Sequence, residues 1–305
     1  MRIFRIVLAL LLATIPSSVL AEISIDKVPS AAVWYFHADF EAMRSGEAGR
    51  SLYDWLDSEV FGELRDEIGF DLGKEANQVT AFAVAENGVV VVIEGGISQT
   101  SRDKILAIAT LAGDMQTLES DGKTYYYAED RDGEHDDETD IGSIDDAAYF
   151  SFALKNKIIV TSTAEKMKSL LSSNGKIAAP QKHEGALFVL SAERNLMQAG
   201  INTDELGHDN DWDSNILRNA RQVAVLVAEE GAEISIEAQL VTTEPEIARS
   251  LASIARGLIS LQAFSDDLDP EARELLNKTN IEVDGSSLRL RITLDPDVFV
   301  AAIAD

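Results

Sequence analysis

The chain has 305 residues and no cysteine, and its 53 Asp and Glu residues outnumber its 26 Lys and Arg residues, which gives a formal net charge of −27. Without cysteine there can be no disulfide, no lipid-anchored cysteine and no cysteine-ligated zinc site. The acidic balance disfavours nucleic acid as a partner, because the phosphate backbone would be repelled. We interpret the charge as a source of solubility.

The first 21 residues have the pattern of a cleavable signal peptide. Arg2 and Arg5 precede an apolar run at 6–15, which is too short to span roughly 30 Å of hydrocarbon as a helix. Small side chains follow up to Ala21. We therefore expect cleavage between Ala21 and Glu22, export to the periplasm or the exterior, and no transmembrane segment in the mature chain. Loss of the two arginines takes the formal net charge from −27 to −29.

Residues 22–179 predict a first α+β unit. An apolar run at 32–39 predicts a strand, and a helical segment follows it. Two further strands meet at a tight turn around Gly88, and a helix follows the second of them. The remaining expected elements are a tyrosine strand at 125–127, an acidic loop at 129–146, strands within 149–161, and a closing helix from Ser162 or Thr163.

Residues 180–305 repeat this order of signals, after a Gly-, Pro- and Lys-containing boundary. Strand 32–39 matches 186–193 at an offset of 154. From the turn glycines onward the offset is 143, and it pairs Gly88 with Gly231 and Glu94 with Glu237. We therefore expect two tandem related units, each an antiparallel sheet with helices packed on one face.

Both units predict a capped helix at equivalent positions. Thr100-x-x-Asp103 and Thr243-x-x-Glu246 each place a hydroxyl and an acid at capping-box spacing. Apolar stripes with helical periodicity follow, and we expect them to face the core. The two stripes are Ile105, Ile108, Ala109 and Ala112, and Ile247, Leu251, Ile254 and Leu258.

Two motifs carry a family resemblance. The opening strand has the form Ala-Val-x-Tyr-Phe-x-Ala-Asp from Ala32, and Lys-Ile-Ile-Val-Thr-Ser-Thr begins at Lys157. This layout resembles a broad group of exported bacterial proteins of unknown function that are built from duplicated α+β units. The resemblance implies an exported protein and a bacterial host, and it transfers no catalytic residues.

Two acidic clusters are weak candidates for divalent-cation binding. A calcium loop requires glycine at position six and glutamate at position twelve. Starting from Asp130 those positions are His135 and Ile141, and starting from Asp209 they are Ser214 and Ala220, so both patterns fail. We interpret the clusters as solvated loops and keep loose calcium binding as an alternative. The candidate ligands are Asp130, Asp132, Glu134, Asp136, Asp209, Asp211 and Asp213.

Three further signals suggest chemistry, and each has a structural alternative. Ser101 and Lys104 have the Ser-x-x-Lys spacing of an activated serine, but no companion motif accompanies them. The segment 69–74 ends in Gly-Lys, like a phosphate loop, but is one residue too short. His37 and Asp39 lie at the end of the opening strand, where a capping role is the more common one.

Aromatic side chains gather at two places. One is the opening strand with Phe40, and the other is the run 125–127, which lies next to the acidic loop. Because successive strand residues point to opposite faces, about half of each run could be exposed to a sugar, a peptide or another sheet, although both faces of such a strand are more often buried. The tyrosine run is the first place where we expect an exposed patch.

These observations favour an exported, non-enzymatic binding protein or envelope-associated scaffold, with no cofactor and with an unknown protein or envelope component as its partner. One alternative is an exported hydrolase with a dispersed active site, because catalytic triads are spatial rather than sequential. The other is low-affinity divalent-cation binding through the acidic loops. No set of catalytic residues is assigned.

Overall fold

The computed structural model describes residues 32–62, 65, 71–84, 88–130, 147–176, 185–193, 219–263 and 278–304. The chain divides into two compact units. Among the described residues, the N-terminal unit contains those within 32–44 and 53–176, and the C-terminal unit contains those within 45–52 and 185–304. The expected signal peptide and the expected boundary between residues 179 and 180 lie outside the described residues.

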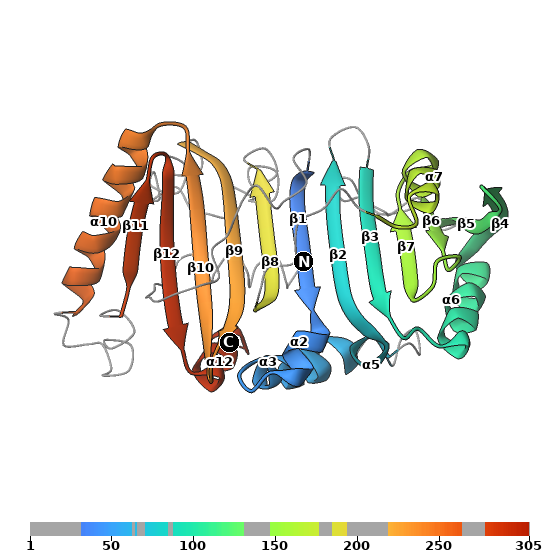
Figure 1. Cartoon of the computed structure of the whole chain (residues 1–305), viewed down its shortest axis with the longest axis horizontal. Coiled ribbons are helices and arrows are strands. Elements are labelled where there is room, and N and C mark those ends of the chain that lie inside the picture. The colour runs from blue at the N-terminus through green and yellow to red at the C-terminus, as the bar shows by residue number, and fades with distance from the viewer. Residues whose placement is uncertain are drawn as a thin grey trace. The chain divides into compact units, whose positions relative to one another are not determined.

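The described elements of the N-terminal unit include seven strands in one sheet, in the order β1-β2-β3-β7-β6-β5-β4, with all neighbours antiparallel. Figure 1 shows this order along the ribbon. The elements in chain order are β1 (Ala32–Asp39), α2 (Phe40–Ser45), α3 (Gly49–Leu56), the π-helix η2 (Asp57–Phe61), α5 (Leu72–Glu75), β2 (Ala76–Val84), β3 (Gly88–Gly95), α6 (Gln99–Ala112), β4 (Gly113–Ser120), β5 (Lys123–Asp130), β6 (Ala147–Ser151), β7 (Lys157–Thr161) and α7 (Ala164–Ser172).

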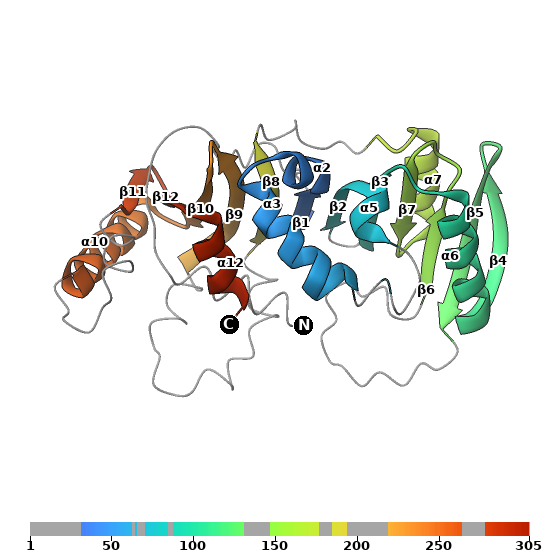
Figure 2. The same cartoon turned by 90° about the horizontal axis from the view of Figure 1, so that it is seen from below.

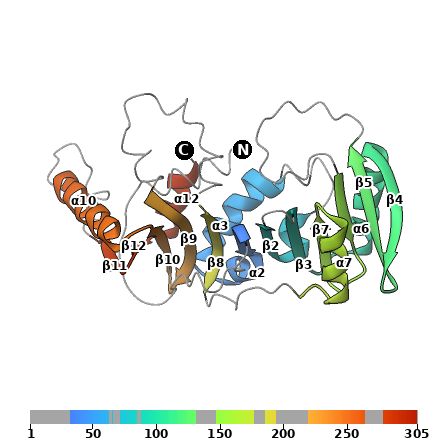
Figure 3. The ribbon, with the colours of Figure 1, turned by 90° about the horizontal axis from the view of Figure 1, so that it is seen from above.

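Helices cover both faces of this sheet, which corrects the expectation of helices on one face. Ile158 packs in a cluster with Ile97 and with Ile105 of α6. Ile159 points to the opposite face, because strand side chains alternate. There it lies beside Gly175, at the end of α7. Figure 3 shows α7 alongside β7. The closing strand is therefore buried on both sides, in agreement with its unbroken Ile-Ile-Val run.

The C-terminal unit has five strands in the order β11-β12-β10-β9-β8, again with all neighbours antiparallel. Helix α10 lies along β11 and β12 (Figure 1) and buries Ala248 and Ala252 against Ile281 and Leu288. The described elements are β8 (Ala186–Glu193), β9 (Ala220–Glu230), β10 (Glu233–Thr242), α10 (Pro245–Ala263), β11 (Asn280–Asp284), β12 (Ser287–Leu294) and α12 (Pro296–Ala304).

Residues 45–52 belong to the C-terminal unit although they precede it in sequence by more than a hundred residues. The Glu229 carboxylate accepts hydrogen bonds from the backbone N–H of Glu47 at 3.0 Å and of Gly49 at 2.9 Å. It thereby satisfies amides at the start of α3. No sequence signal indicated this grouping.

The two capping predictions are wrong in position. Helix α6 is capped by Ser98, whose Oγ accepts from the backbone N–H of Ser101 at 3.1 Å, and Thr100 lies inside the helix. Helix α10 begins at Pro245, which suits the first helical position because proline lacks an N–H. The carbonyl of Glu244 accepts the N–H groups of Ile247 and Ala248 there. Each unit still begins a helix within two residues of the expected point.

The described part of the chain is thus an α+β protein built from antiparallel strands. None of its described helices combines the length and the apolar character that crossing a membrane requires.

Candidate functional site

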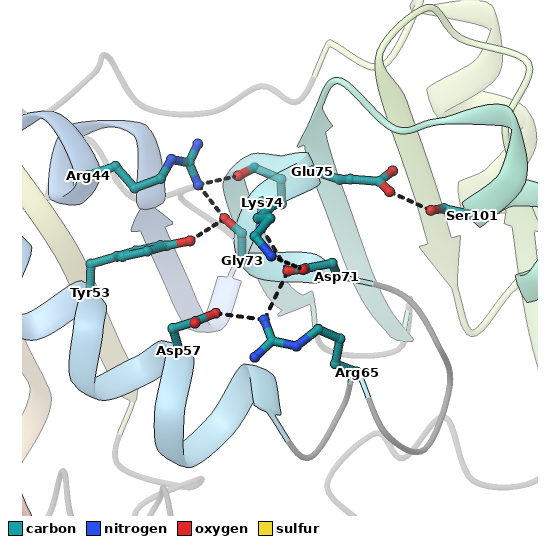
Figure 4. Close-up of polar contacts among 10 residues, drawn as sticks. Arg44, Tyr53, Asp57, Arg65, Asp71, Gly73, Lys74, Glu75 and Ser101 are labelled. Carbon is teal, nitrogen blue, oxygen red and sulfur yellow. Dashed lines mark hydrogen bonds and ion pairs between the residues drawn. The ribbon is translucent and has the colours of Figure 1, made fainter.

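Helix α5 is the centre of a network of polar contacts in the N-terminal unit (Figure 4). The carbonyl oxygen of Gly73 accepts hydrogen bonds from Nη1 of Arg44 at 2.5 Å and from the Tyr53 hydroxyl at 2.6 Å. Arg44 also donates to the Ala76 carbonyl at 3.0 Å and lies over the Tyr53 ring, 5.5 Å from its centroid. These contacts hold α2, α3 and α5 together at the start of β2.

A row of charges continues from this point. Arg65 bonds to Asp57 at 2.9 Å and to Asp71 at 3.2 Å, and Lys74 bonds to Asp71 at 2.8 Å. Burial acts to raise the pKa of the Asp71 carboxyl, but the hydrogen bonds from Lys74 and the charge of Arg65 outweigh it, so the pKa is lowered. The pKa of Lys74 is raised by its hydrogen bond to Asp71.

The Gly-Lys resemblance to a phosphate loop has no phosphate-binding geometry here. Asp71 caps the short helix α5 by accepting from the backbone N–H of Lys74, and the Lys74 amine bonds back to the same carboxylate. Each positive charge of the row therefore faces a carboxylate of its own chain. The arrangement suits a folded loop rather than an anion site.

Ser101 bonds to a carboxylate of α5. Its Oγ donates to Oε1 of Glu75 at 2.6 Å, and Glu75 also accepts from the backbone N–H of Ser98 at 2.6 Å. Ser101 is only 5% exposed, whereas Lys104 is exposed. A nucleophile has to reach its substrate, and this buried hydroxyl instead helps to fix the N-terminus of α6.

His37 and Asp39 serve the junction between β1 and α2. Asp39 is 2% exposed, accepts from the backbone N–H of Ala42 at 2.8 Å, and so caps α2. It also accepts from Gln78 at 2.7 Å on the neighbouring strand. The His37 ring lies 2.9 Å from the Thr80 hydroxyl. Both side chains therefore bond to neighbours within the sheet.

The acidic clusters lie almost entirely outside the described residues. This holds for Asp132, Glu134, Asp136, Asp209, Asp211 and Asp213. Asp130 ends β5, where its backbone pairs with Gly113, and its side chain is not described. Within the described ranges, no three His, Asp or Glu side chains come together to hold a metal ion.

The tyrosine run is not an exposed patch. Tyr125 is 3% exposed, Tyr126 stacks on Phe150 with ring centroids 5.2 Å apart, and Tyr127 lies 5.0 Å from Tyr149. Helix α6 contacts β4 and β5, and α7 contacts β6 and β4, next to these rings. The opening strand is also largely covered, and Tyr35 is 2% exposed.

Among the described residues, the exposed large apolar side chains lie on α6 and α10, with one more, Val298, on α12 at 38% exposed. The sequence assigned an apolar stripe of α6 and of α10 to the core. In α6, Leu111 is 83% and Ile108 is 38% exposed. In α10, Leu261 is 71%, Leu258 is 55% and Ile254 is 36% exposed. The inward faces, represented by Ile105 and Leu251, do pack as expected. The sequence signal that we missed is the width of the apolar stripe. On each helix, apolar residues extend around more of the circumference than the face that packs against the sheet.

These helix segments also lack negative charge. Residues 105–112 contain no charged side chain, and residues 250–263 contain only Arg256, in a chain with 53 acidic residues. Apolar exposure and missing acids thus coincide on α6 and α10.

No family model and no curated protein matches the chain. Three crystal forms of one protein, TP0453, resemble it in structure at 12% sequence identity. Form IV aligns over 91% of this chain and 95% of that chain with a TM-score of 0.50. Form III covers 93% and 99% with a TM-score of 0.42, and form I covers 94% and 98% with a TM-score of 0.44. At this identity, the likeness to form IV concerns the fold alone.

Proposed function

We propose that this protein is an exported, non-enzymatic binding protein that contacts a partner protein through the apolar side chains of α6 and α10. The exposed leucines carry the proposal, above all Leu111 at 83% and Leu261 at 71%. Single exposed apolar residues are ordinary on protein surfaces, but a run along one helix is a common sign of an interaction site. Complete burial of a leucine contributes about 1.5–3 kcal/mol, so a few such residues suffice to anchor a partner.

The polar side chains that suggested hydrolysis support the non-enzymatic reading. Ser101 and Asp39 are buried, and their oxygen atoms bond to helix ends and to neighbouring strands. Such bonds stabilise the fold and leave these groups poorly placed to meet a substrate. A hydrolase would have to use other residues.

Export and internal duplication belong to the same proposal. The basic start, the short apolar run and the small residues before Glu22 support export. In both units the first three strands and the closing strand of the repeat lie side by side in that order. These strands are β1, β2, β3 and β7 in the N-terminal unit and β8, β9, β10 and β12 in the C-terminal unit, and the recurrence supports duplication. In each unit an acid of the third strand also lies opposite a base of the closing strand. These pairs are Glu94 with Lys157, and Glu237 with Arg291.

Site-specific photocrosslinking in the cell of origin tests the binding function. A benzophenone amino acid replaces Leu111, Leu261 or, as a control on a polar exposed turn, Lys155. We expect a discrete crosslinked product at one or both leucine positions and none at Lys155. With the benzophenone residue at position 261, the double substitution Ile254→Gln with Leu258→Gln should abolish the α10 product without changing the circular dichroism spectrum. Equal labelling at Lys155, or no product at any position, would reject the proposal.

A further inference from the structure

Strand β4 leaves one edge of the N-terminal sheet open. It has eight residues and stands last in the strand order, paired on one side with β5. No described strand pairs with its other side. An open edge presents a row of unpaired N–H and C=O groups, to which an extended chain can add as a further strand.

The turn identifies which backbone groups face outward. Asp121 and Gly122 both have positive φ, 52° and 69°, as a two-residue type I′ hairpin turn requires. The flanking residues Ser120 and Lys123 form a register pair. In such a hairpin this pair is hydrogen-bonded, and the residues of each strand then alternate between inward and outward backbone groups. The N–H of Thr117 therefore points to the open edge.

Helix α6 lies next to this strand and contributes apolar surface. It contacts β4 and β5 and leads directly into β4 (Figure 2). Thr110 on its last turn lies 3.7 Å from the Met115 sulfur. The exposed residues Leu111 and Ile108 thus belong to the helix that contacts this strand.

Three exposed side chains of the hairpin carry negative charge. Glu119 on β4, Asp121 in the turn and Glu129 on β5 are all exposed. A strand that adds here would meet acids from the sheet and apolar groups from α6. Charge complementarity therefore selects a segment with Lys or Arg between apolar residues.

We propose that β4 binds an extended segment of a partner protein as an added antiparallel or parallel strand, and that the segment alternates basic with apolar side chains. The outward N–H and C=O groups of β4 supply the hydrogen bonds, and Leu111 and Ile108 supply the apolar contact. This inference rests on the proposed binding function and specifies its partner and its mode at α6.

The test uses the full mature chain and a synthetic probe, acetyl-Lys-Leu-Lys-Val-Lys-Leu-Lys-amide, in calorimetry at physiological salt and at threefold higher salt. The main variant is Thr117→Pro. Proline removes the outward N–H without touching the bonds to β5, and edge strands tolerate it at such positions. The matched control is Thr117→Val, which keeps the N–H and favours a strand.

We expect saturable binding to the wild-type chain and to the Thr117→Val variant, with affinities within about twofold of each other. Thr117→Pro should weaken binding by about tenfold or more, since a hydrogen bond is lost and the ring obstructs the incoming carbonyl. Leu111→Gln should weaken it severalfold. A probe with Glu in place of Lys, or with N-methyl groups at alternate residues, should not bind.

Several results would overturn the inference. Equal affinity for Thr117→Pro and Thr117→Val would rule out strand addition. If Leu111→Gln reduced binding while Thr117→Pro did not, the α6 surface and the proposed binding function would stand, and strand addition at β4 would not. Loss of binding at the higher salt would reduce the contact to general electrostatics. Self-association that Thr117→Pro abolishes would identify a second copy of the chain as the occupant, and absence of any binding would reject the inference.

Discussion

Tyr35 is a buried phenol whose ionisation is strongly suppressed. It is 2% exposed, and loss of hydration raises its pKa from 10.0 to about 12. Because the folded pKa exceeds the unfolded one, the neutral phenol adds stability below pH 10, and this contribution disappears as the pH rises toward 12. Absorbance titration near 295 nm should show one tyrosine that ionises last, and Tyr35→Phe should remove that step. If Tyr35→Phe removed absorbance change near pH 10 and left the last step in place, the assignment would be contradicted.

Gly95 and Gly96 form a natural pair for testing backbone packing. A Cβ atom on Gly95 would lie 2.0 Å from the Glu75 carbonyl oxygen and 2.8 Å from Cα of Ala76. Backbone cannot move aside as a flexible side chain can, so Gly95→Ala should reduce the free energy of unfolding by about 3 kcal/mol. At Gly96 a Cβ meets nothing within 4 Å, and Gly96→Ala should be close to neutral. Urea denaturation of both variants measures the difference, and equal midpoints would contradict it.

At the scale of elements, the acidic cap of α5 predicts a dependence of stability on pH. The pKa of Asp71 is lowered from 3.8 in the folded chain, so its contribution is present above that value and is lost as the pH falls. Asp71→Asn should therefore be less stable than the wild type at pH 7, with a difference that shrinks below about pH 4. Urea midpoints at several pH values test this. A difference that grows toward low pH would have the wrong sign.

The helices show what local patterns can and cannot predict. Hydrophobic periodicity located α6 and α10, because a core-facing stripe has a 3.6-residue period. It placed Ile108, Ile254 and Leu258 in the core, and the structure leaves them exposed. A stripe reports which residues are apolar, whereas the number that become buried depends on how much sheet lies beneath the helix.

Strand β10 shows a second limit of local patterns. Its alternation of Ile with Ser, Glu and Gln is typical of a strand with one solvated face. Yet Ser235, Glu237 and Gln239 are 3–5% exposed. Two of them bond to β12, where Ser235 accepts from Arg291 at 3.1 Å and Gln239 donates to Ser287 at 2.7 Å. The partners of Ser235 and of the Gln239 amide nitrogen lie some fifty residues away, and a local pattern contains no information about them.

At the scale of the whole molecule, the sequence predicted the α+β class, the antiparallel pairing and the order of most described elements. It did so because tight turns at Gly88, Gly231 and Gly285 fix which strands are neighbours, and all three glycines have positive φ. It did not predict that residues 45–52 group with the C-terminal unit, since Glu229 reaches them across 180 residues or more. The exposed leucines of the candidate surface were missed for the same reason, because exposure is a property of the assembled sheet.

The charge of the whole chain predicts that salt stabilises it. With a formal net charge of −27, folding brings like charges together, and their repulsion opposes the compact state. The Debye length falls from roughly 30 Å at 0.01 M to about 10 Å at 0.1 M ionic strength, so added sodium chloride should relieve the repulsion. We expect the midpoint of thermal unfolding to rise by about 3 °C over that range, which for a chain of this size corresponds to roughly 1 kcal/mol.

Calcium chloride at matched ionic strength separates general screening from cation binding. If the acidic clusters only repel, both salts should shift the midpoint nearly equally, apart from the stronger screening by divalent ions. If Asp130 and the carboxylates near Asp209 hold calcium, the midpoint should continue to rise with calcium at constant ionic strength, because a ligand that binds the folded state stabilises it by mass action. A midpoint that stays flat or falls as sodium chloride is added would show that the acids of this chain do not repel one another enough to oppose folding.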